Sequence, residues 1–518
     1  MRRFTPGILA DGEGMPRSTI GWLRECAAET TGGSYTRAYE SLQGENESLQ
    51  AESTFTTVRN RVGAFLVRLT PTERQRLLGL TIVSGGLCGL VAVSFHLGID
   101  AAQTLMINRA LQAPNLSWIF WTIFTPTMGG LVVGLGLRYW FPGAVGSGVP
   151  QVKLAYARYA GRVPFRDAIG KFVLGIVQIG SGASLGREGP TVQICAGVSS
   201  LLARLSSLSR QSQRRLTPVG VAAGIAAAFN APIAAVTFTL EEIIGDLDQT
   251  MLSGVIVAAA IAAAIERGIL GQHPVFEIRQ AYTMGHATSL VSYAVLGLLS
   301  AVASLAFTDS LLGLRAWFKR FTLMPKWVHP AMGGALTGTL AVLALGWLKQ
   351  RGIAGGGYPT LALALTGSLP VKVMIGLCLL KLAATVCSYA SGGVGGIFAP
   401  ALFIGGMLGG TIGYVDVNVF HHAADSIGAF ALVGMGAVFA GIVRAPMTSV
   451  VIIFEMTGSY DLILPLMIAN MSAYGLARHW RPLPIYEALL LQDEVVLPHG
   501  KPITPENAEA ELPGEVPP

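Results

Sequence analysis

The sequence predicts an all-α polytopic membrane protein made of two related halves. Three observations lead to this class: a low content of charged residues, several long apolar stretches, and a weak internal repeat. The chain has 518 residues, of which 52% are hydrophobic and only 13% are charged, whereas soluble domains carry about 25% charged residues. The composition therefore excludes an ordinary soluble protein and favours a chain that lies mostly within a bilayer.

Several apolar stretches approach the ~20 residues that a helix needs to cross a bilayer. They are residues 79–97, 117–137, 251–265, 290–308, 331–348 and 426–443. The 64 glycines and 27 prolines are spread through the apolar part of the chain and are not gathered in linkers. Membrane helices tolerate these residues where they are broken or closely packed, so we expect many short or interrupted helices.

The two ends of the chain are polar. Residues 1–55 predict a flexible cytoplasmic tail and residues 56–70 an amphipathic helix at the membrane surface, while residues 494–518 predict a disordered C-terminal tail. We expect no cleavable signal peptide, because residues 1–50 lack a continuous apolar core. The positive-inside rule predicts a cytoplasmic N-terminus, because a cluster of arginines opposed only by Glu73 precedes the first span: Arg59, Arg61, Arg68, Arg74 and Arg76.

The cysteines predict neither a disulfide framework nor a metal site. The five cysteines, Cys26, Cys88, Cys195, Cys378 and Cys387, form no CxxC pair and no metal-ligand spacing, and all but Cys26 lie in apolar sequence. We interpret them as small packing residues and expect no metal and no cofactor.

Three pairs of segments recur in the same order along the chain. They are GAVGSGVP and GIAGGGYP, SGASLGREGP and SGGVGGIFAP, and GVAAGIAAAFNAPIAAVTFTLEE and GMGAVFAGIVRAPMTSVVIIFEM. Their start positions, 143 and 352, 181 and 391, and 220 and 434, differ by 209, 210 and 214 residues. The alternative is that glycine-rich membrane helices simply resemble one another.

The nearly constant offset indicates an internal duplication within a membrane domain at residues 56–493. We expect a first repeat at about 75–270, a second at about 286–480, and a final helix at about 484–493. Duplicated membrane proteins with Gly/Pro-interrupted segments in matching places are typical of transporters whose site lies between the halves.

Four short segments predict helices that begin inside the membrane. They are GSGVP (146–150), GREGP (186–190), GGIFAP (395–400) and PLPIY (482–486), each with a proline in or near the first helical turn. A helix that begins there directs unpaired N–H groups and its positive dipole end into the protein, which favours anion binding. For each motif alone, a simple helix kink is the alternative.

The residue types at these helix starts suit a dehydrated halide. Ser147 offers a hydroxyl donor, Gly148 permits close approach of the backbone, and the amides of Ile397 and Phe398 are expected to point at the same place. Tyr486 adds a phenolic donor. The candidate chloride-binding residues are Ser147, Gly148, Glu188, Gly189, Ile397, Phe398 and Tyr486.

Glu188 is a charged residue in an apolar setting. A charge in the bilayer interior costs about 2.5–3.5 kcal/mol on insertion scales, so such residues usually have a function. A helix N-terminus stabilises its carboxylate in the place where an anion would bind, so the side chain competes with the ion. Protonation of Glu188 would remove the competitor and load a proton together. The alternative is a structural ion pair with Arg187, which neighbouring positions on a helix disfavour.

A second acid is marked by an asymmetry between the repeats. Glu241 aligns with Glu455 and is interpreted as architectural, whereas Glu242 aligns with Met456 and has no acidic counterpart. We predict that Glu242 passes protons between bulk water and Glu188; the alternative is that both glutamates are interfacial charges. Three basic residues also lie in apolar surroundings, without assigned partners: Lys171, Lys381 and Arg444.

At these motifs, from about residue 75 to 493, the chain resembles the CLC family of chloride channels and proton-coupled chloride exchangers. The resemblance implies the CLC-type fold, with two inverted structural repeats and broken, re-entrant helices, assembled as a homodimer with one pathway per subunit. It implies a central chloride site at Ser147, Ile397, Phe398 and Tyr486. Serine at position 147 is similar to the chloride-preferring members, since nitrate-preferring members carry proline there.

The same resemblance implies that Glu188 is the external gating glutamate and Glu242 the internal proton glutamate of exchangers. We therefore predict a chloride/proton antiporter in a cell membrane, most simply a bacterial inner membrane, with chloride, protons and the lipid bilayer as partners and no nucleic acid. A passive chloride channel of the same fold is the alternative. An intramembrane enzyme would need a serine–histidine, paired-aspartate or HExxH arrangement, so we do not expect an enzyme.

Overall fold

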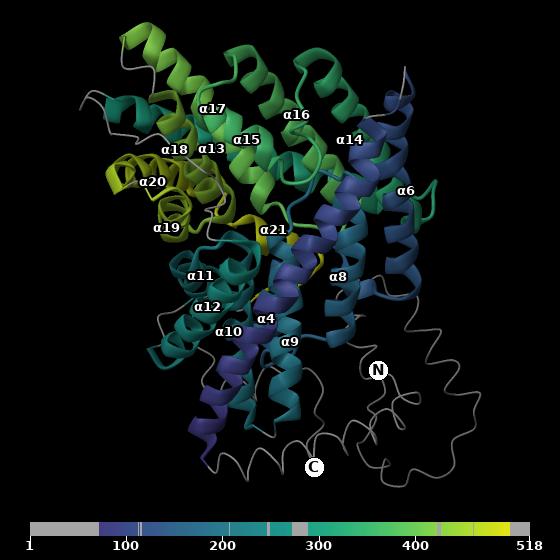
Figure 1. Cartoon of the computed structure of the whole chain (residues 1–518), viewed down its shortest axis with the longest axis vertical. Coiled ribbons are helices and arrows are strands. Elements are labelled where there is room, and N and C mark those ends of the chain that lie inside the picture. The colour runs from purple at the N-terminus through teal and green to yellow at the C-terminus, as the bar shows by residue number, and fades with distance from the viewer. Residues whose placement is uncertain are drawn as a thin grey trace, which may run out of the picture.

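The computed structural model describes residues 72–497, except residues 112, 114, 115, 207, 246–248, 272–288, 422–425 and 459. Within these described residues, every regular element is a helix (Figure 1). The predicted tail at residues 1–55, the predicted surface helix at 56–70 and Cys26 lie outside them.

The first half of the membrane domain begins and ends with a long helix. Its elements are α4 (Glu73–Gln103), η1 (Thr104–Asn108), α5 (Arg109–Leu111), α6 (Ser117–Tyr139), η2 (Pro142–Ala144), α7 (Val149–Arg158), α8 (Phe165–Gly180), α9 (Glu188–Leu205), α10 (Arg210–Phe229), α11 (Pro232–Phe238), η3 (Thr239–Ile244) and α12 (Gln249–Leu270).

The second half repeats this order of long and short helices and ends in one additional short helix. Its elements are α13 (Ser289–Arg320), η4 (Lys326–Val328), α14 (His329–Leu343), η5 (Ala344–Leu348), α15 (Tyr358–Leu365), α16 (Val371–Ala390), α17 (Phe398–Phe420), α18 (Ser426–Val443), α19 (Pro446–Thr457), η6 (Tyr460–Leu462), α20 (Ile463–Trp480) and α21 (Ile485–Gln492).

Seven helical stretches in the described part of the chain are long and apolar enough to cross a bilayer: Glu73–Asn108, Ser117–Tyr139, Met251–Leu270, Ser289–Arg320, Lys326–Leu348, Val371–Ala390 and Phe398–Phe420. Five of the six predicted stretches lie within them. The sixth, 426–443, forms the apolar helix α18, which is shorter and lies in the protein interior. The last two of the seven were not among the predicted spans.

The two halves meet through equivalent segments. Helix α6 packs against α14, α11 against α19, and α9 against α17; in each pair the second helix occupies the place in its half that the first occupies in the other. In Figure 1, α9 lies in the lower part of the molecule and α17 in the upper part, and both begin near the centre. This is the arrangement of two inverted repeats.

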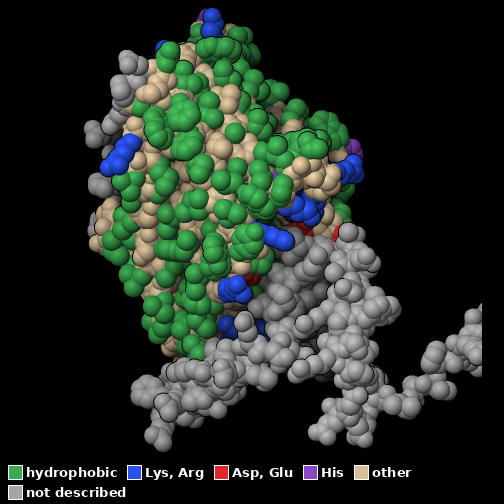
Figure 2. Space-filling model, turned by 90° about the vertical axis from the view of Figure 1, so that its right-hand side faces the viewer, with side chains coloured by type: hydrophobic (Ala, Val, Ile, Leu, Met, Phe, Trp, Pro, Cys, Tyr) green, Lys and Arg blue, Asp and Glu red, His purple; other side chains and the backbone are tan. Residues whose placement is uncertain are grey.

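Most of the interior is one large apolar cluster that extends through both halves, and glycines allow its helices to approach closely. A methyl group at Gly405 of α17 would collide with the backbone of Gly434 in α18. The outer surface is also apolar: the face shown in Figure 2 is covered largely by hydrophobic side chains, with only scattered Lys and Arg. A surface of this kind suits contact with lipid.

The packed chain continues four residues beyond its predicted end at residue 493. Val495 and Leu497 are buried in a small cluster with Leu154 and Leu490, so the predicted disordered tail is wrong for residues 494–497. Residues 498–518 lie outside the described residues.

Candidate ion pathway

Helices begin at all four motifs that the sequence singled out. Helix α7 begins at Val149, α9 at Glu188, α17 at Phe398 and α21 at Ile485, and α9 packs against α7 and α17 while α21 packs against α7. Four helix N-termini, with their unpaired N–H groups and positive dipole ends, therefore gather at the centre of the protein.

The loops before these helices are joined by backbone hydrogen bonds that obey the repeat. Gly186 and Gly396, which are 210 residues apart, each donate an N–H to the other's carbonyl at 2.7 Å. Each loop also contacts the opposite half in an equivalent way, since Gly146 N donates to Gly393 O at 3.1 Å and Gly355 N donates to Ala183 O at 3.0 Å. The pseudo-twofold axis therefore passes between Gly186 and Gly396, next to Glu188.

The GSGVP loop presents the Ser147 hydroxyl to this centre. Gly148 has a φ of +103°, a conformation that glycine adopts readily, and a side chain at Gly189 would collide with the Ser147 hydroxyl. The hydroxyls of Ser147 and Tyr486 are both fully buried, and neither has a hydrogen-bond partner of good geometry among the described residues. Because buried polar groups are normally satisfied, the two donors suit an anion.

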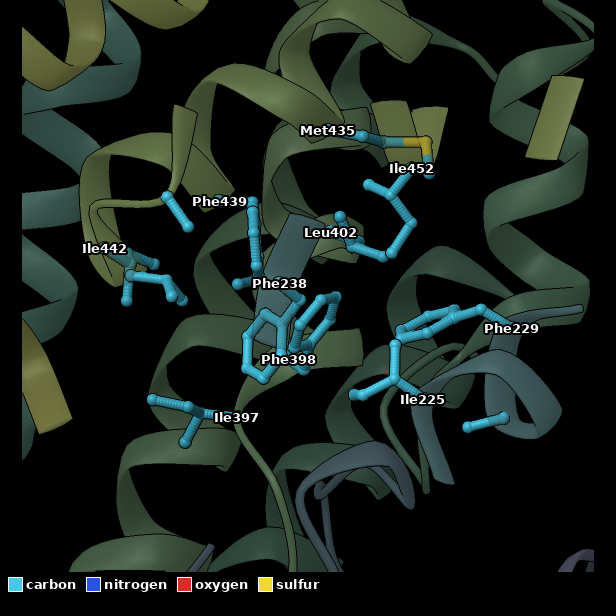
Figure 3. Packing of buried hydrophobic residues seen from close by; sticks show 14 of the residues in the cluster. Ile225, Phe229, Phe238, Ile397, Phe398, Leu402, Met435, Phe439, Ile442 and Ile452 are labelled. Atoms are coloured by element: carbon cyan, nitrogen blue, oxygen red, sulfur yellow. The ribbon is translucent and has the colours of Figure 1, made fainter. Parts of the chain in front are cut away.

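Phe398 is fixed by other aromatic rings, as Figure 3 shows. Its ring centroid lies 4.1 Å from that of Phe439, 4.8 Å from that of Phe229 and 5.9 Å from that of Phe238. Because its side chain packs into this apolar cluster, the first residues of α17 are held with their backbone amides at the helix start, where a helix leaves N–H groups without internal acceptors.

Two buried lysines support the loops in equivalent ways, and they are themselves 210 residues apart. Lys171 donates to the carbonyls of Val145 (3.2 Å) and Gly146 (2.8 Å). Lys381 donates to three carbonyls of the second loop at 2.6–3.1 Å, those of Gly352, Ile353 and Gly355. The sequence did not assign these partners.

The third unassigned basic residue, Arg444, also binds the backbone. It donates to the carbonyls of Tyr474 and Arg481 at 3.2 and 3.0 Å. All three basic residues therefore hold loops or helix ends in place.

Glu188 is the first residue of α9 and is fully buried. Its Oε1 accepts a hydrogen bond of 2.5 Å from the phenol of Tyr358, and its Oε2 has no hydrogen-bond partner among the described residues. Arg187 turns away and contacts Nδ1 of His96 and the carbonyl of Ala228. This contradicts the alternative of an ion pair between Arg187 and Glu188.

Glu242 lies in a buried charge cluster with Lys153 and Glu487. Its side chain is 4% exposed, and its Oε1 accepts a hydrogen bond of 2.9 Å from Lys153. Lys153 also donates to Glu487 at 2.9 Å. The hydroxyl of Tyr486 interacts electrostatically with both Glu242 and Glu188, so both acids lie near the candidate anion site.

The sequence reasoning missed three residues near the two candidate acids: Tyr358 and Lys153, which contact them, and Glu487, which shares Lys153 with Glu242. One signal was available for Tyr358, because it aligns with Val149 under the repeat and so differs from its counterpart, as Glu242 does. The same signal was available for Lys153, which aligns with Ala362, whereas Glu487 lies in the final helix, outside the two repeats. Among the described residues, no group of three or more His, Cys, Asp or Glu side chains is placed to hold a metal ion.

Comparisons with known proteins agree with this architecture. The model of the family described as voltage gated chloride channel matches residues 129–478. Two relatives described as H(+)/Cl(-) exchange transporter ClcA, from Salmonella arizonae and Citrobacter koseri, are each 31% identical over 443 residues, which cover 84% of this chain and 92% of the relative.

Solved structures share the fold. A slow cyanobacterial Cl-/H+ antiporter matches with a TM-score of 0.73 and 25% identity, covering 80% of this chain and 97% of that one. A eukaryotic CLC transporter matches with a TM-score of 0.66 and 20% identity, covering 80% of this chain and 73% of that one. The chain therefore belongs to the voltage-gated chloride channel (CLC) family.

Proposed function

We propose that this protein is a chloride/proton antiporter in which Glu188 is the gate and proton acceptor and Glu242 exchanges protons with the other side. One observation carries the proposal: the carboxylate of Glu188 lies at a helix start where four helix N-termini gather and where the hydroxyls of Ser147 and Tyr486 lack good partners. The bacterial relatives and the cyanobacterial structure, whose names describe chloride/proton exchange, support it.

In this geometry, the carboxylate of Glu188 and the transported anion compete for the same site. An anion and an ionised Glu188 are both attracted to the positive ends of the same helices, so they exclude each other. Protonation makes the side chain neutral and releases it from this attraction. Loading a proton on Glu188 therefore opens the pathway to chloride, which links the movement of the two ions.

Protons need a route that differs from that of chloride. Glu242 is a buried acid that interacts electrostatically with Tyr486, as Glu188 does, and Lys153 holds its carboxylate. We assign to Glu242 the transfer of protons between Glu188 and the cytoplasm. The cytoplasmic N-terminus and the location in a bacterial inner membrane are part of the same proposal, supported by the arginines before α4 and by the bacterial relatives.

We also propose a homodimer with one pathway per subunit. Helices α11, α12, α19 and α20 form a contiguous group, and large apolar side chains of this group are exposed: Ile233, Ile256, Met447, Leu464, Met467 and Met471. Flexible methionines favour close packing against another protein surface, so this group is the proposed dimer interface.

The test is a simultaneous measurement of chloride and proton movement in liposomes that contain the purified protein. Proton transport against its own gradient, driven by chloride, supports exchange. Rapid chloride movement without protons would instead identify a passive channel, the main alternative.

A further inference from the structure

We propose that Tyr358 is a positioning residue that holds the gating carboxylate of Glu188 in its closed position and thereby limits the rate of transport. The inference rests on the proposed function of Glu188. It concerns a different residue, however, and can fail while that function stands.

The contact between the two side chains is short and direct. The phenol of Tyr358 donates to Oε1 of Glu188 at 2.5 Å, which is within the range of strong O–H···O hydrogen bonds to an ionised carboxylate. Glu188 is fully buried, so water does not compete easily for this oxygen. The hydrogen bond therefore stabilises the carboxylate of Glu188 in the position that it occupies in the structure.

The backbone that carries Tyr358 is fixed by a hydrogen bond from Gly355 N to the Ala183 carbonyl of the opposite half and by a buried charge. Tyr358 is the first residue of α15 and follows two glycines with positive φ, Gly355 (+57°) and Gly357 (+80°). Lys381 donates to three carbonyls of the same loop. The phenol therefore approaches Glu188 from a rigid support.

The aromatic ring is also held from the side. The guanidinium carbon of Arg187 lies 5.9 Å from the centroid of the Tyr358 ring, within the range of cation–π attraction. Arg187 is itself held by Nδ1 of His96, whose Nε2 lies 2.9 Å from the carboxylate of Asp100. These contacts place the hydroxyl of Tyr358 at the carboxylate of Glu188 and restrict other orientations of the ring.

The repeat shows that the scaffold does not need this hydrogen bond. Under the offsets of 209 and 210 residues, Tyr358 corresponds to Val149 and Glu188 corresponds to Phe398. The equivalent pair in the other half is therefore apolar, although both helices form there as well. The tyrosine hydroxyl is a feature of the gate and not a requirement of the fold.

A transport cycle must break this contact, because the carboxylate of Glu188 has to leave its position before chloride passes. Removing the hydroxyl lowers the stability of the closed position. We expect Tyr358→Phe to raise the turnover of coupled exchange by about tenfold, the lower end of what a hydrogen bond to a charged group contributes.

The experiment compares turnover in liposomes for the wild type, Tyr358→Phe, Glu188→Ala and the double variant. Tyr293→Phe is the matched control, since it also removes the hydroxyl of a buried tyrosine but lies on α13, where it stacks on Phe430. Tyr358→Val, which copies the residue of the other repeat, replaces Tyr358→Phe if the latter does not fold.

We predict that Tyr358→Phe raises the turnover and that Tyr293→Phe leaves it unchanged. In the Glu188→Ala background, Tyr358→Phe should have no further effect on the turnover, because the carboxylate that it contacts is already absent. A turnover of Tyr358→Phe that is equal to or lower than that of the wild type overturns the inference. An increase in turnover of the same size with and without Glu188 overturns it as well. If Glu188→Ala itself remains fully coupled to protons, the proposed function of Glu188 fails instead.

Discussion

Glu241 and Glu455 cap each other's helices. The carboxylate of Glu241 accepts the N–H groups of Met447 (3.3 Å) and Thr448 (2.9 Å) at the start of α19, the helix that carries Glu455. The carboxylate of Glu455 accepts the N–H groups of Ile233 and Ala234, at 3.0 and 2.7 Å, at the start of α11, which continues into the segment with Glu241.

This reciprocal capping explains why the two adjacent glutamates, Glu241 and Glu242, have different roles. The repeat places Glu241 opposite Glu455, and each carboxylate satisfies N–H groups that a helix start leaves unpaired. Glu242 has no such counterpart and contacts Lys153 instead. The interpretation of Glu241 as architectural agrees with its contacts.

Glu241→Ala should lower stability without abolishing coupling. The substitution removes a carboxylate that caps α19, and the loss of a helix cap costs about 0.5–2 kcal/mol. Thermal unfolding of the purified protein in detergent measures the loss, with Glu455→Ala as the symmetry-related control. A stable Glu241→Ala that no longer moves protons would contradict the architectural role.

Glu188→Ala should transport chloride without protons. The substitution removes both the competitor for the anion site and the group that accepts the proton. Chloride efflux and pH change, recorded on the same liposomes, measure the two ions separately. Chloride flux that still drives protons uphill would exclude Glu188 as the gate.

Glu242→Gln should reduce proton transport by at least about tenfold and chloride transport much less. The amide keeps the size of the side chain and its contact with Lys153, but a side-chain amide does not take up and release protons as a carboxyl group does. The same paired flux measurement applies, and Glu241→Gln is the adjacent control. Equal loss of both fluxes would point to a folding defect and not to a proton route.

Lys153→Met should also reduce proton transport, because it leaves Glu242 and Glu487 without their shared cation. Removing one partner of a buried charge cluster leaves an uncompensated carboxylate, which is strongly unfavourable. Lys153→Arg keeps the positive charge and should retain most of the activity. If Lys153→Met exchanges protons as well as the wild type does, Lys153 has no part in the proton route.

Much of the fold was predictable from periodic features of the sequence. Long apolar stretches identified five of the seven helices suited to cross a membrane, and the helix starts at Val149, Glu188, Phe398 and Ile485 followed from glycine and proline placement. Helix α16 was missed as a span because Lys381 interrupts its apolar character. In the structure, the ammonium group of Lys381 points into the protein and donates to three loop carbonyls.

The partners of the site residues were not predictable in the same way. Tyr358 and Glu188 are 170 residues apart, and Lys153 and Glu487 are 334 residues apart. Such contacts depend on how the halves pack, which hydropathy does not encode. The repeat was the most informative guide, because polar residues without a counterpart, such as Glu188, Glu242 and Tyr358, gather at the centre while matched residues support the scaffold.

The most direct test of the account is proton uptake by liposomes that contain the purified protein, under an imposed chloride gradient. The experiment begins without a pH gradient, and potassium with valinomycin fixes the voltage. We predict that chloride movement drives protons against their electrochemical gradient, and that Glu188→Ala abolishes this coupling. Rapid chloride flux with no coupled proton movement in the wild type would contradict the account and identify a passive pathway.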